Sequence, residues 1–514
     1  MLGIGLVNML VALDQTVVST ALPSIIAELH GFEYYAWIAS AYLLASVVTV
    51  PVFGRLGDYF RRKRFVIAAA IVFSVASALC GLATDMRFLA AARALQGVGG
   101  GMMVGTAFAS IPDLFPDPRA RVRWQVVMAA AYGIGTAAGP SLGGWLSEHF
   151  GWRSTFMVNL PVGVLALYFI WAHLPACRHA RTGEVRIDWA GAALVALVLV
   201  AFQAVIEAVP KDGPTPTHLA LIAVVAVGAV ALLVCERRAT HPIIPLDLFR
   251  DPQLVTLFTL STLSGFVMFS LIFFAPLLLH GGFGLSPQEA GLLATPIAAC
   301  IALGSLVNTR IVIHLKKPIL SVGFGLLVCA SSGLAFATRA TPHPWLELSM
   351  AAVGIGLGFI LNNLNVFAQK IAGRECFGIT TALLQSTRMV GGMLGTSIVA
   401  TIVNHRYASG VGDALAVLGA PGAARWQPQL ADPRVLIDPA LHRALTTHMK
   451  DAGPDGAALI EAVRHVLVDA IHLGIGLTGF AALVAALCVR RIAHIRFSRV
   501  AAVAAAPASF RVSE

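Results

Sequence analysis

The amino-acid sequence predicts an all-α integral membrane protein that crosses the bilayer many times. Of its 514 residues, 57% are hydrophobic and only 12% are charged, whereas soluble domains keep about a quarter of their residues charged. The mean hydropathy is +0.80. Apolar runs of about 18–25 residues, the length that crosses the hydrocarbon core as a helix, recur along the chain. Because the bilayer interior offers the backbone no hydrogen-bonding partner, each run is expected to be helical.

Fourteen such runs can be distinguished, most of them joined by short polar hairpins. Six runs, a pair and six further runs follow one another, which favours two six-helix bundles separated by an inserted two-helix hairpin. We expect the N-terminal bundle over 1–175, the hairpin over 176–250, the C-terminal bundle over 251–492 and a tail over 493–514. The predicted spans are 2–26, 35–53, 65–84, 88–110, 123–146, 154–174, 188–207, 217–235, 254–279, 288–309, 318–338, 346–368, 378–403 and 467–489.

The distribution of basic residues predicts the orientation. Most of the 36 Lys and Arg residues fall in short loops on one side of the predicted spans, and they are densest between residues 54 and 64. The positive-inside rule places this side, and with it both termini, in the cytoplasm. The polar segment 404–466 is then a long extracytoplasmic loop. Its amphipathic part, Gly456–His472, is expected either to lie on the membrane surface or to be a plain linker into the last span.

Several function classes are disfavoured by what the sequence lacks. The formal net charge of +10 comes without a basic patch interleaved with aromatic residues, so nucleic-acid binding is not expected. The seven cysteines lie in or beside apolar runs, which argues against a disulfide framework. There is no Walker-type phosphate loop and no H-E-x-x-H or C-x-x-C pattern. We therefore expect no enzyme activity, no catalytic residues, no metal site and no cofactor.

Three charges fall deep inside predicted spans, namely Asp14, Arg93 and Arg388. A carboxylate at the centre of a membrane helix costs roughly 2.5–3.5 kcal/mol, so Asp14 is expected to have a function or a partner. Burial favours the protonated form of such an acid and a nearby cation favours the carboxylate, which allows its protonation to change. We expect Asp14 to bind a proton; the alternative is a permanent ion pair with an arginine that fixes packing.

Four stretches together resemble the major facilitator superfamily, and specifically its fourteen-helix drug:proton antiporter branch. The first is Leu13–Val18 with Ala21-Leu22-Pro23, which is similar to the first-helix motif of that branch. The second, between helices 2 and 3, resembles the signature loop whose Asp and Arg latch the cytoplasmic ends of the bundles in the outward-facing state. A basic loop also serves simply as a topology determinant. Arg61 replaces the later glycine of the motif, and the gating residues implied are Gly54, Gly57, Asp58, Arg62 and Arg64.

The third stretch, Arg93–Gly100, resembles a fourth-helix motif whose arginine takes part in proton transfer. Arg is not deprotonated in proteins, so Arg93 would be a fixed counter-charge that tunes Asp14; the alternative is that it only caps backbone carbonyls.

The fourth stretch, Gly133–Gly144, resembles the fifth-helix antiporter motif. Glycines every four residues also occur in ordinary membrane packing, and Pro140 permits a bend. The motif residues are Gly135, Gly139, Pro140, Gly143 and Gly144.

Polar residues in both halves are expected to line a cavity for amphipathic organic molecules, although interhelical hydrogen bonding is the alternative. Arg388, and no carboxylate, is the deep charge of the second half, which argues against strongly cationic drugs and divalent substrates. The predicted cavity residues are Thr16, Tyr42, Gln96, Asn362, Asn365, Gln385 and Arg388.

The resemblance implies a proton-coupled exporter, an antiporter, of hydrophobic or amphipathic drugs across the bacterial inner membrane, with a role in antibiotic resistance. The proton gradient would supply the energy. Expected partners are small-molecule amphipathic substrates, protons and membrane lipid, with a possible periplasmic adaptor and outer-membrane channel. The alternatives are a dedicated exporter of one metabolite, siderophore or lipid, and a membrane receptor that does not transport.

Overall fold

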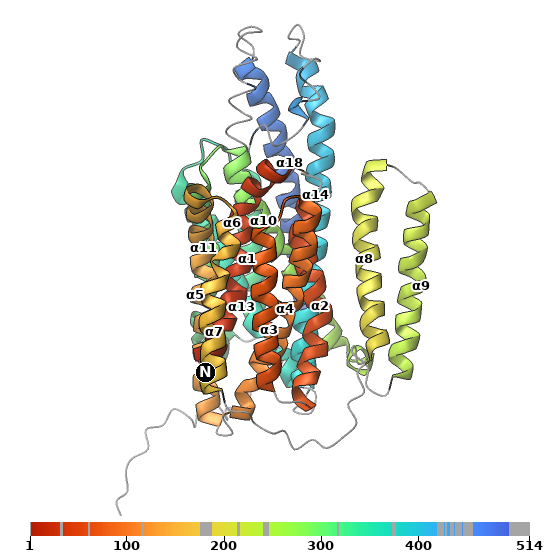
Figure 1. Cartoon of the computed structure of the whole chain (residues 1–514). Helices are drawn as coiled ribbons and strands as arrows, with labels where there is room; N and C mark the ends of the chain where they lie inside the picture. The colour runs from red at the N-terminus through yellow and green to blue at the C-terminus, as the bar shows by residue number, and fades with distance from the viewer. Residues whose placement is uncertain are drawn as a thin grey trace, which may run out of the picture.

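Long, roughly parallel α-helices make up the computed structural model (Figure 1), and no strand occurs in the part of the chain that it describes. This arrangement satisfies the backbone hydrogen bonds of apolar segments within each helix. The described residues are 2–30, 34–59, 62–114, 118–174, 188–212, 216–239, 246–315, 318–372, 377–418, 426, 429–431, 436, 445 and 456–492.

The first half of the chain forms a group of helices in which α2 packs on α4, α1 on α5, and α3 on both α4 and α7. Short α6 and the following α7 meet at Val158 and together make one candidate span, Arg153–His173. The helices are α1 (Leu2–Leu29), α2 (Tyr35–Tyr59), α3 (Arg62–Gly81), α4 (Met86–Leu114), α5 (Pro118–Phe150), α6 (Arg153–Met157) and α7 (Asn159–His173).

The second half repeats this plan: α11 packs on α13, α10 on α14, and α12 on α13 and α18. The Asp251 side chain accepts a hydrogen bond from the Gln253 backbone N–H and a proline follows it, a common way to start a helix. The elements are η2 (Leu246–Arg250), α10 (Pro252–Leu277), the π-helical turn η3 (Leu278–Gly282), α11 (Pro287–Leu315), α12 (Pro318–Ala335), α13 (His343–Ala372), α14 (Phe377–Leu418), α18 (Gly456–Cys488) and η4 (Val489–Arg491).

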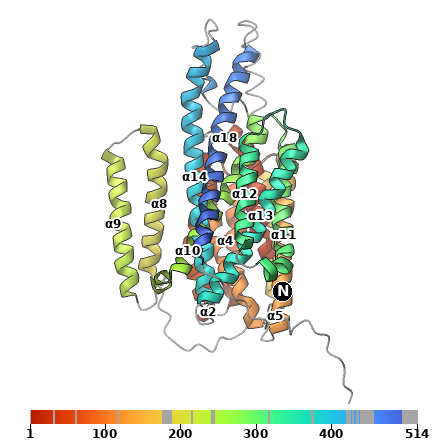
Figure 2. The ribbon, with the colours of Figure 1, turned by 180° about the vertical axis from the view of Figure 1, so that it is seen from behind.

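Helices α8 (Trp189–Asp212) and α9 (Pro216–Arg238) pair with each other and stand beside α14 (Figures 1 and 2). The Ser397 hydroxyl of α14 lies 2.7 Å from the Gln203 side-chain oxygen of α8, and the Thr401 hydroxyl donates to the Ile206 carbonyl at 3.3 Å. Large apolar side chains such as Val227 and Val230 of α9 are 68% and 61% exposed. Such exposure fits a helix whose outer surface faces lipid, because proteins surrounded by water rarely expose large contiguous apolar patches.

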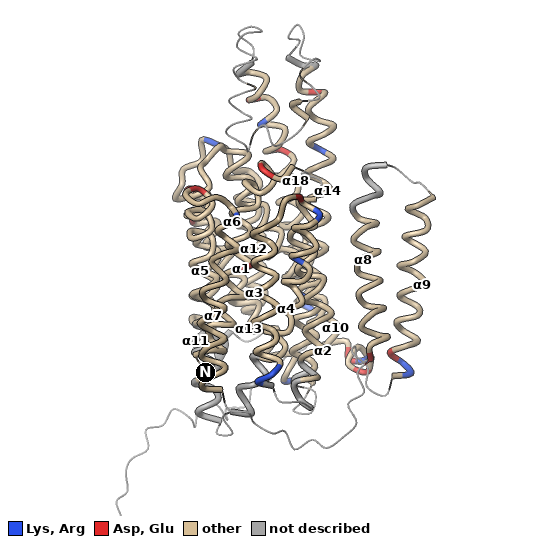
Figure 3. Tube along the Cα trace, in the orientation of Figure 1, with Lys and Arg blue, Asp and Glu red and all other residues tan. Residues whose placement is uncertain are grey.

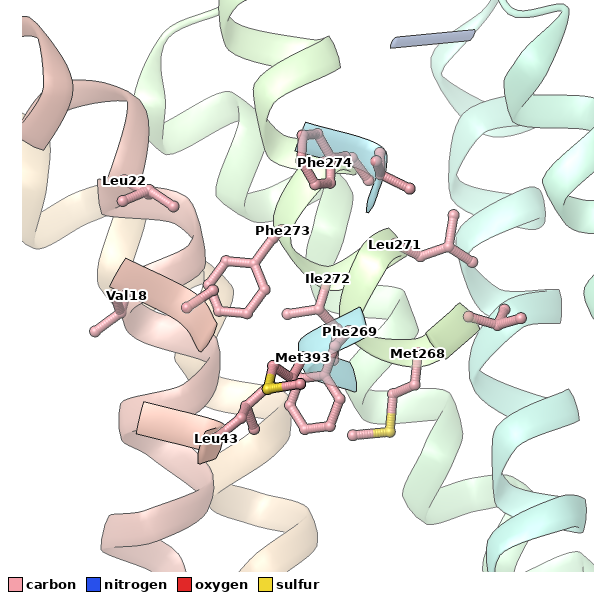
Figure 4. Close-up of a cluster of buried hydrophobic side chains, with 14 of the residues drawn as sticks. Val18, Leu22, Leu43, Met268, Phe269, Leu271, Ile272, Phe273, Phe274 and Met393 are labelled. Carbon is pink, nitrogen blue, oxygen red and sulfur yellow. The ribbon is translucent and has the colours of Figure 1, made fainter. Parts of the chain in front are cut away.

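The two halves meet along two helix pairs, α5 with α11 and α2 with α14. Between them, apolar side chains from α1 and α2, including Val18, Leu22 and Leu43, meet Phe269 of α10 and Met393 of α14 in a buried cluster (Figure 4). The Tyr35 hydroxyl at the start of α2 donates to the Phe273 carbonyl of α10 at 2.7 Å. The halves are therefore in direct contact.

Within the described residues, twelve helices are long and apolar enough to cross a membrane. Helices α4 and α5, with 29 and 33 residues, lie among them in sequence and are also long enough. All of the predicted spans thus fall on helices. In Figure 3, basic residues mark the start of α3 and the end of α9 at the same end of the molecule, as the orientation argument expects.

The last two helices are longer than the sequence suggests. Helix α14 has 42 residues, or roughly 63 Å at 1.5 Å per residue, and Figures 1 and 2 show α14 and α18 projecting beyond the other helices at one end. Neither alternative for Gly456–His472, a helix along the membrane surface or a plain linker, is found, because this segment is the first half of the continuous helix α18. Its amphipathic pattern is explained by packing on α14.

Candidate functional site

Asp14 lies in the middle of α1 and is completely buried. Its Oδ2 accepts a hydrogen bond from Arg93 Nη1 at 2.7 Å. Its Oδ1 accepts from Gln96 Nε2 at 2.7 Å and from Asn159 Nδ2 at 2.9 Å. The structure thus brings together the two residues predicted to couple protons, Asp14 and Arg93. The Asp14 carboxylate therefore has the paired cation and the hydrogen-bond donors that a buried anion requires.

Arg93, on α4, is 1% exposed and is held from several sides. Its Nη1 also donates to the Gln96 side-chain oxygen, and its Nε donates to the Ile38 carbonyl of α2 at 3.2 Å. The guanidinium carbon lies 4.7 Å from the centre of the Tyr42 ring, within cation–π range. Arg93 therefore pairs with Asp14 and also caps a backbone carbonyl, so the two alternatives considered from sequence coexist.

Ser77 and Asn159 complete the network around Asp14. The Ser77 hydroxyl on α3 accepts from Gln96 Nε2 at 2.7 Å and from Asn159 Nδ2 at 3.3 Å. Four helices, α1, α3, α4 and α7, consequently meet through polar side chains in the interior of the first half. Neither Asn159 nor Ser77 is among the site residues predicted from the sequence. The usable signal was a fully polar amide at the start of the otherwise apolar α7.

Tyr42 packs against the Asp14–Arg93 pair, with its ring over the Arg93 guanidinium and its hydroxyl against Gly100 of α4. It lies within electrostatic range of Tyr132 on α5, which in turn interacts with Arg388 on α14.

The glycines of the fifth-helix motif make close contact with both neighbours of α5. A β-carbon at Gly135 would collide with the Met9 carbonyl, and one at Gly139 with the Thr16 hydroxyl, both on α1. A β-carbon at Gly143 would collide with Val17 and Thr20, also on α1.

The other two motif residues face the second half. Gly144 lies against the Pro287 carbonyl of α11, and the Pro140 carbonyl lies against Gly291. The hydroxyls of Ser141 and Thr295 are paired beside them. Helix α5 therefore joins the halves, with the stripe Gly135, Gly139 and Gly143 against α1 and with Pro140 and Gly144 against α11.

The predicted gating residues lie at the ends of two helices. Gly54, Gly57 and Asp58 fall in the last turns of α2, and Arg62 and Arg64 in the first turn of α3. Arg64 is exposed, whereas the side chains of Asp58 and Arg62 lie outside the described part of the structure. The latch stays a prediction.

The structure does not gather the predicted cavity residues in one place. Gln96 is part of the Asp14 network, and the buried Thr16 hydroxyl donates to the Ala12 carbonyl at 3.1 Å within α1. Asn365 donates to the Leu361 carbonyl of its own helix at 3.1 Å. Asn362 is half-buried, and its neighbour Asn363 makes the cross-helix bond, to Asn308 at 2.7 Å.

The remaining cavity residues stand near the contact between the halves. Tyr42 and Arg388 both lie within electrostatic range of Tyr132. Gln385, one turn before Arg388 on α14, is half-buried. Among the described residues, no group of three or more His, Cys, Asp and Glu side chains is placed to hold a metal ion.

Comparison with known proteins places this geometry in context. Residues 4–396 match the Major Facilitator Superfamily. The chain is 33% identical over 405 residues to the multidrug transporter protein MdtP of Bacillus subtilis (strain 168), covering 77% of this chain and 73% of that protein. It is 29% identical over 441 residues to multidrug resistance protein 3 of the same organism, covering 85% of each.

A third relative matches along nearly the whole chain. The tetracenomycin C resistance and export protein of Streptomyces glaucescens is 29% identical over 493 residues, covering 95% of this chain and 90% of that protein. Among solved structures, an inward-facing, unoccupied bacterial homolog of the human lysosomal transporter Spinster aligns with a TM-score of 0.64 and 16% identity over 96% of each chain. At that identity the likeness supports the fold alone.

Proposed function

The chain belongs to the Major Facilitator Superfamily and is a multi-pass membrane transporter, not an enzyme, and from this premise we propose that it is a proton-coupled exporter of hydrophobic or amphipathic drugs. The relatives named for multidrug transport and drug export support the direction and the class of cargo. The proposed location is the bacterial inner membrane. Both termini are placed in the cytoplasm because basic residues gather at the end of the molecule where α3 begins and α9 ends.

The single observation that carries the coupling proposal is the buried pair of Asp14 and Arg93, 2.7 Å apart. Arg93 keeps its charge under all physiological conditions, so the proton-binding partner is Asp14. Protonation would neutralise the carboxylate and weaken its bonds to Arg93, Gln96 and Asn159. These bonds join α1 to α4 and α7. Gain or loss of one proton would therefore change how the helices of the first half hold together.

Exchange requires that this change reach the second half. Helix α5 packs on α1 through Gly139 and on α11 through Gly144, so a shift of α1 is passed to α11 by direct backbone contact. Antiport follows if cargo and proton stabilise different arrangements of the two halves, since a ligand shifts an equilibrium only by its differential affinity for the two states. We propose that α5 is the element on which the halves rock.

Everted membrane vesicles test the proposal, because export then appears as uptake. Vesicles containing the protein should take up the fluorescent amphiphile 11-(dansylamino)undecanoic acid when respiration generates a proton gradient, and a protonophore should stop uptake. The variant Asp14→Asn should insert normally, and its rate of gradient-driven uptake should fall at least about tenfold, which corresponds to about 1.4 kcal/mol of coupling free energy. The matched control is Asp247→Asn, since Asp247 is 84% exposed in a surface pair with Arg250. Full, protonophore-sensitive uptake by Asp14→Asn would remove Asp14 from the mechanism.

A dedicated exporter is the second candidate, because the relative that matches over 95% of this chain is named for resistance to, and export of, a single compound. A drug-susceptibility panel on a strain lacking the protein separates the two. Sensitivity to many unrelated compounds supports the broad exporter, and sensitivity to one supports the dedicated exporter.

A further inference from the structure

Among the described residues, no carboxylate pairs with the intramembrane cation Arg388. It lies within the membrane-crossing part of α14, Ile379–Leu415. In the part of the chain that the structure describes, the one ion pair with both side chains buried is Arg93–Asp14, and no hydrogen bond or salt bridge engages the Arg388 side chain. Arg stays charged in proteins, and at the centre of a membrane helix it costs roughly 2.5–3.5 kcal/mol.

The sequence offers no carboxylate nearby. Between residues 252 and 403 the acidic residues are Glu289, Glu347 and Glu375. Glu289 and Glu347 are exposed near the starts of α11 and α13, and Glu375 lies outside the described residues, between α13 and α14. In the first half, the Val47 carbonyl of α2 accepts a hydrogen bond from Ser386 of α14 at 3.5 Å. Asp58 lies about 16 Å further along α2 than Val47. Among the described residues of the second half, no carboxylate therefore lies beside Arg388.

Arg388 lies near the contact between the halves. Its backbone packs on Gly265 of α10 in its own half, and Arg388 lies within electrostatic range of Tyr132 on α5, in the other half. Both side chains keep part of their surface accessible, unlike the fully enclosed Arg93.

Gln385 stands beside Arg388 on the same face of α14, one turn earlier. Its side-chain oxygen is buried without a hydrogen-bond partner among the described residues. An unpaired buried polar atom costs about 1–3 kcal/mol. Because an amide can turn by 180° to present its NH₂ group, Gln385 can donate to an anion held by Arg388.

From these observations, and resting on the proposed export function, we propose that Arg388 binds an anionic group of the transported molecule. The favoured cargo is an amphipathic anion, a carboxylate or sulfonate on an apolar body, and not a cation. A planar guanidinium holds such groups by two parallel hydrogen bonds. Binding would balance the one intramembrane charge that lacks a partner among the described residues, while Asp14 stays paired with Arg93.

The test is equilibrium binding to the full chain in lipid nanodiscs, which needs no gradient. The probes are 11-(dansylamino)undecanoic acid and its uncharged methyl ester, detected by energy transfer from protein tryptophans with empty nanodiscs as blank. The wild-type protein should bind the acid at least about tenfold more tightly than the ester. Arg388→Gln should abolish this preference by weakening acid binding while leaving ester binding within about twofold, and Arg388→Lys should retain most of it.

Arg406→Gln is the matched control, the same substitution at an exposed position further along α14, and it should leave both affinities unchanged. The proposal is overturned if Arg388→Gln weakens both probes equally or changes neither, or if the wild-type protein prefers the ester. The outcome is separate from that of the export proposal. Selective acid binding without gradient-driven uptake would overturn export alone, and normal uptake without selectivity would overturn the role of Arg388 alone.

Discussion

The two intramembrane arginines sit in contrasting surroundings. Arg93 is enclosed in the first half by a carboxylate, an amide, a backbone carbonyl and an aromatic ring. Arg388 stands in the second half, half-buried, with Tyr132 as its electrostatic neighbour from the other half. The same type of side chain is thus neutralised in one half and left without a carboxylate partner, among the described residues, in the other. The difference teaches that pairing, and not residue type, decides which charge is free to act on a ligand.

Removing Arg93 should have the largest effect. Arg93→Leu leaves the buried Asp14 carboxylate without its cation and should lower the free energy of unfolding by about 3–5 kcal/mol, measured by thermal unfolding of the purified protein. The double variant Asp14→Leu with Arg93→Leu should regain much of that loss, because neither charge is then stranded. Arg388→Leu should not destabilise the protein. Equal losses at Arg93 and Arg388 would break the comparison.

Removing Asn159 should have an intermediate effect. Asn159→Ala takes away one of three donors to Asp14 and should cost about 1.5–3 kcal/mol, the range for hydrogen bonds to charged groups. The matched control is Asn365→Ala in the second half, where the amide bonds only to a carbonyl of its own helix. If both variants unfold at the same temperature, the Asn159 hydrogen bond to Asp14 contributes no more to stability than the Asn365 hydrogen bond within its own helix.

Changing the ring above Arg93 should have the smallest effect. Tyr42→Phe keeps the aromatic face that lies 4.7 Å from the guanidinium and loses only the hydroxyl, at a cost of about 0.5–1.5 kcal/mol. Tyr42→Leu also removes the cation–π contact, adding about 0.5–2 kcal/mol. Thermal unfolding distinguishes the two variants. A Tyr42→Leu protein as stable as Tyr42→Phe would show that the ring does not stabilise Arg93.

Much of the fold was predictable because membrane insertion is governed by local composition. The spans, their grouping and the depth of Asp14, Arg93 and Arg388 follow from hydropathy along the chain. Local composition was less informative for Gly456–His472, because an amphipathic stretch is equally compatible with a surface helix and with a helix that packs on a neighbouring helix. The latter is found.

By itself, then, the sequence determined that three charges lie inside the membrane and that one of them is acidic. Only the tertiary structure decided that Asp14 meets Arg93, that Asn159 and Ser77 join them, and that Arg388 has no such partner among the described residues. The physical reason is that hydropathy is summed along one helix. Pairing depends instead on which faces of helices far apart in sequence, such as α1 and α4, are packed against each other.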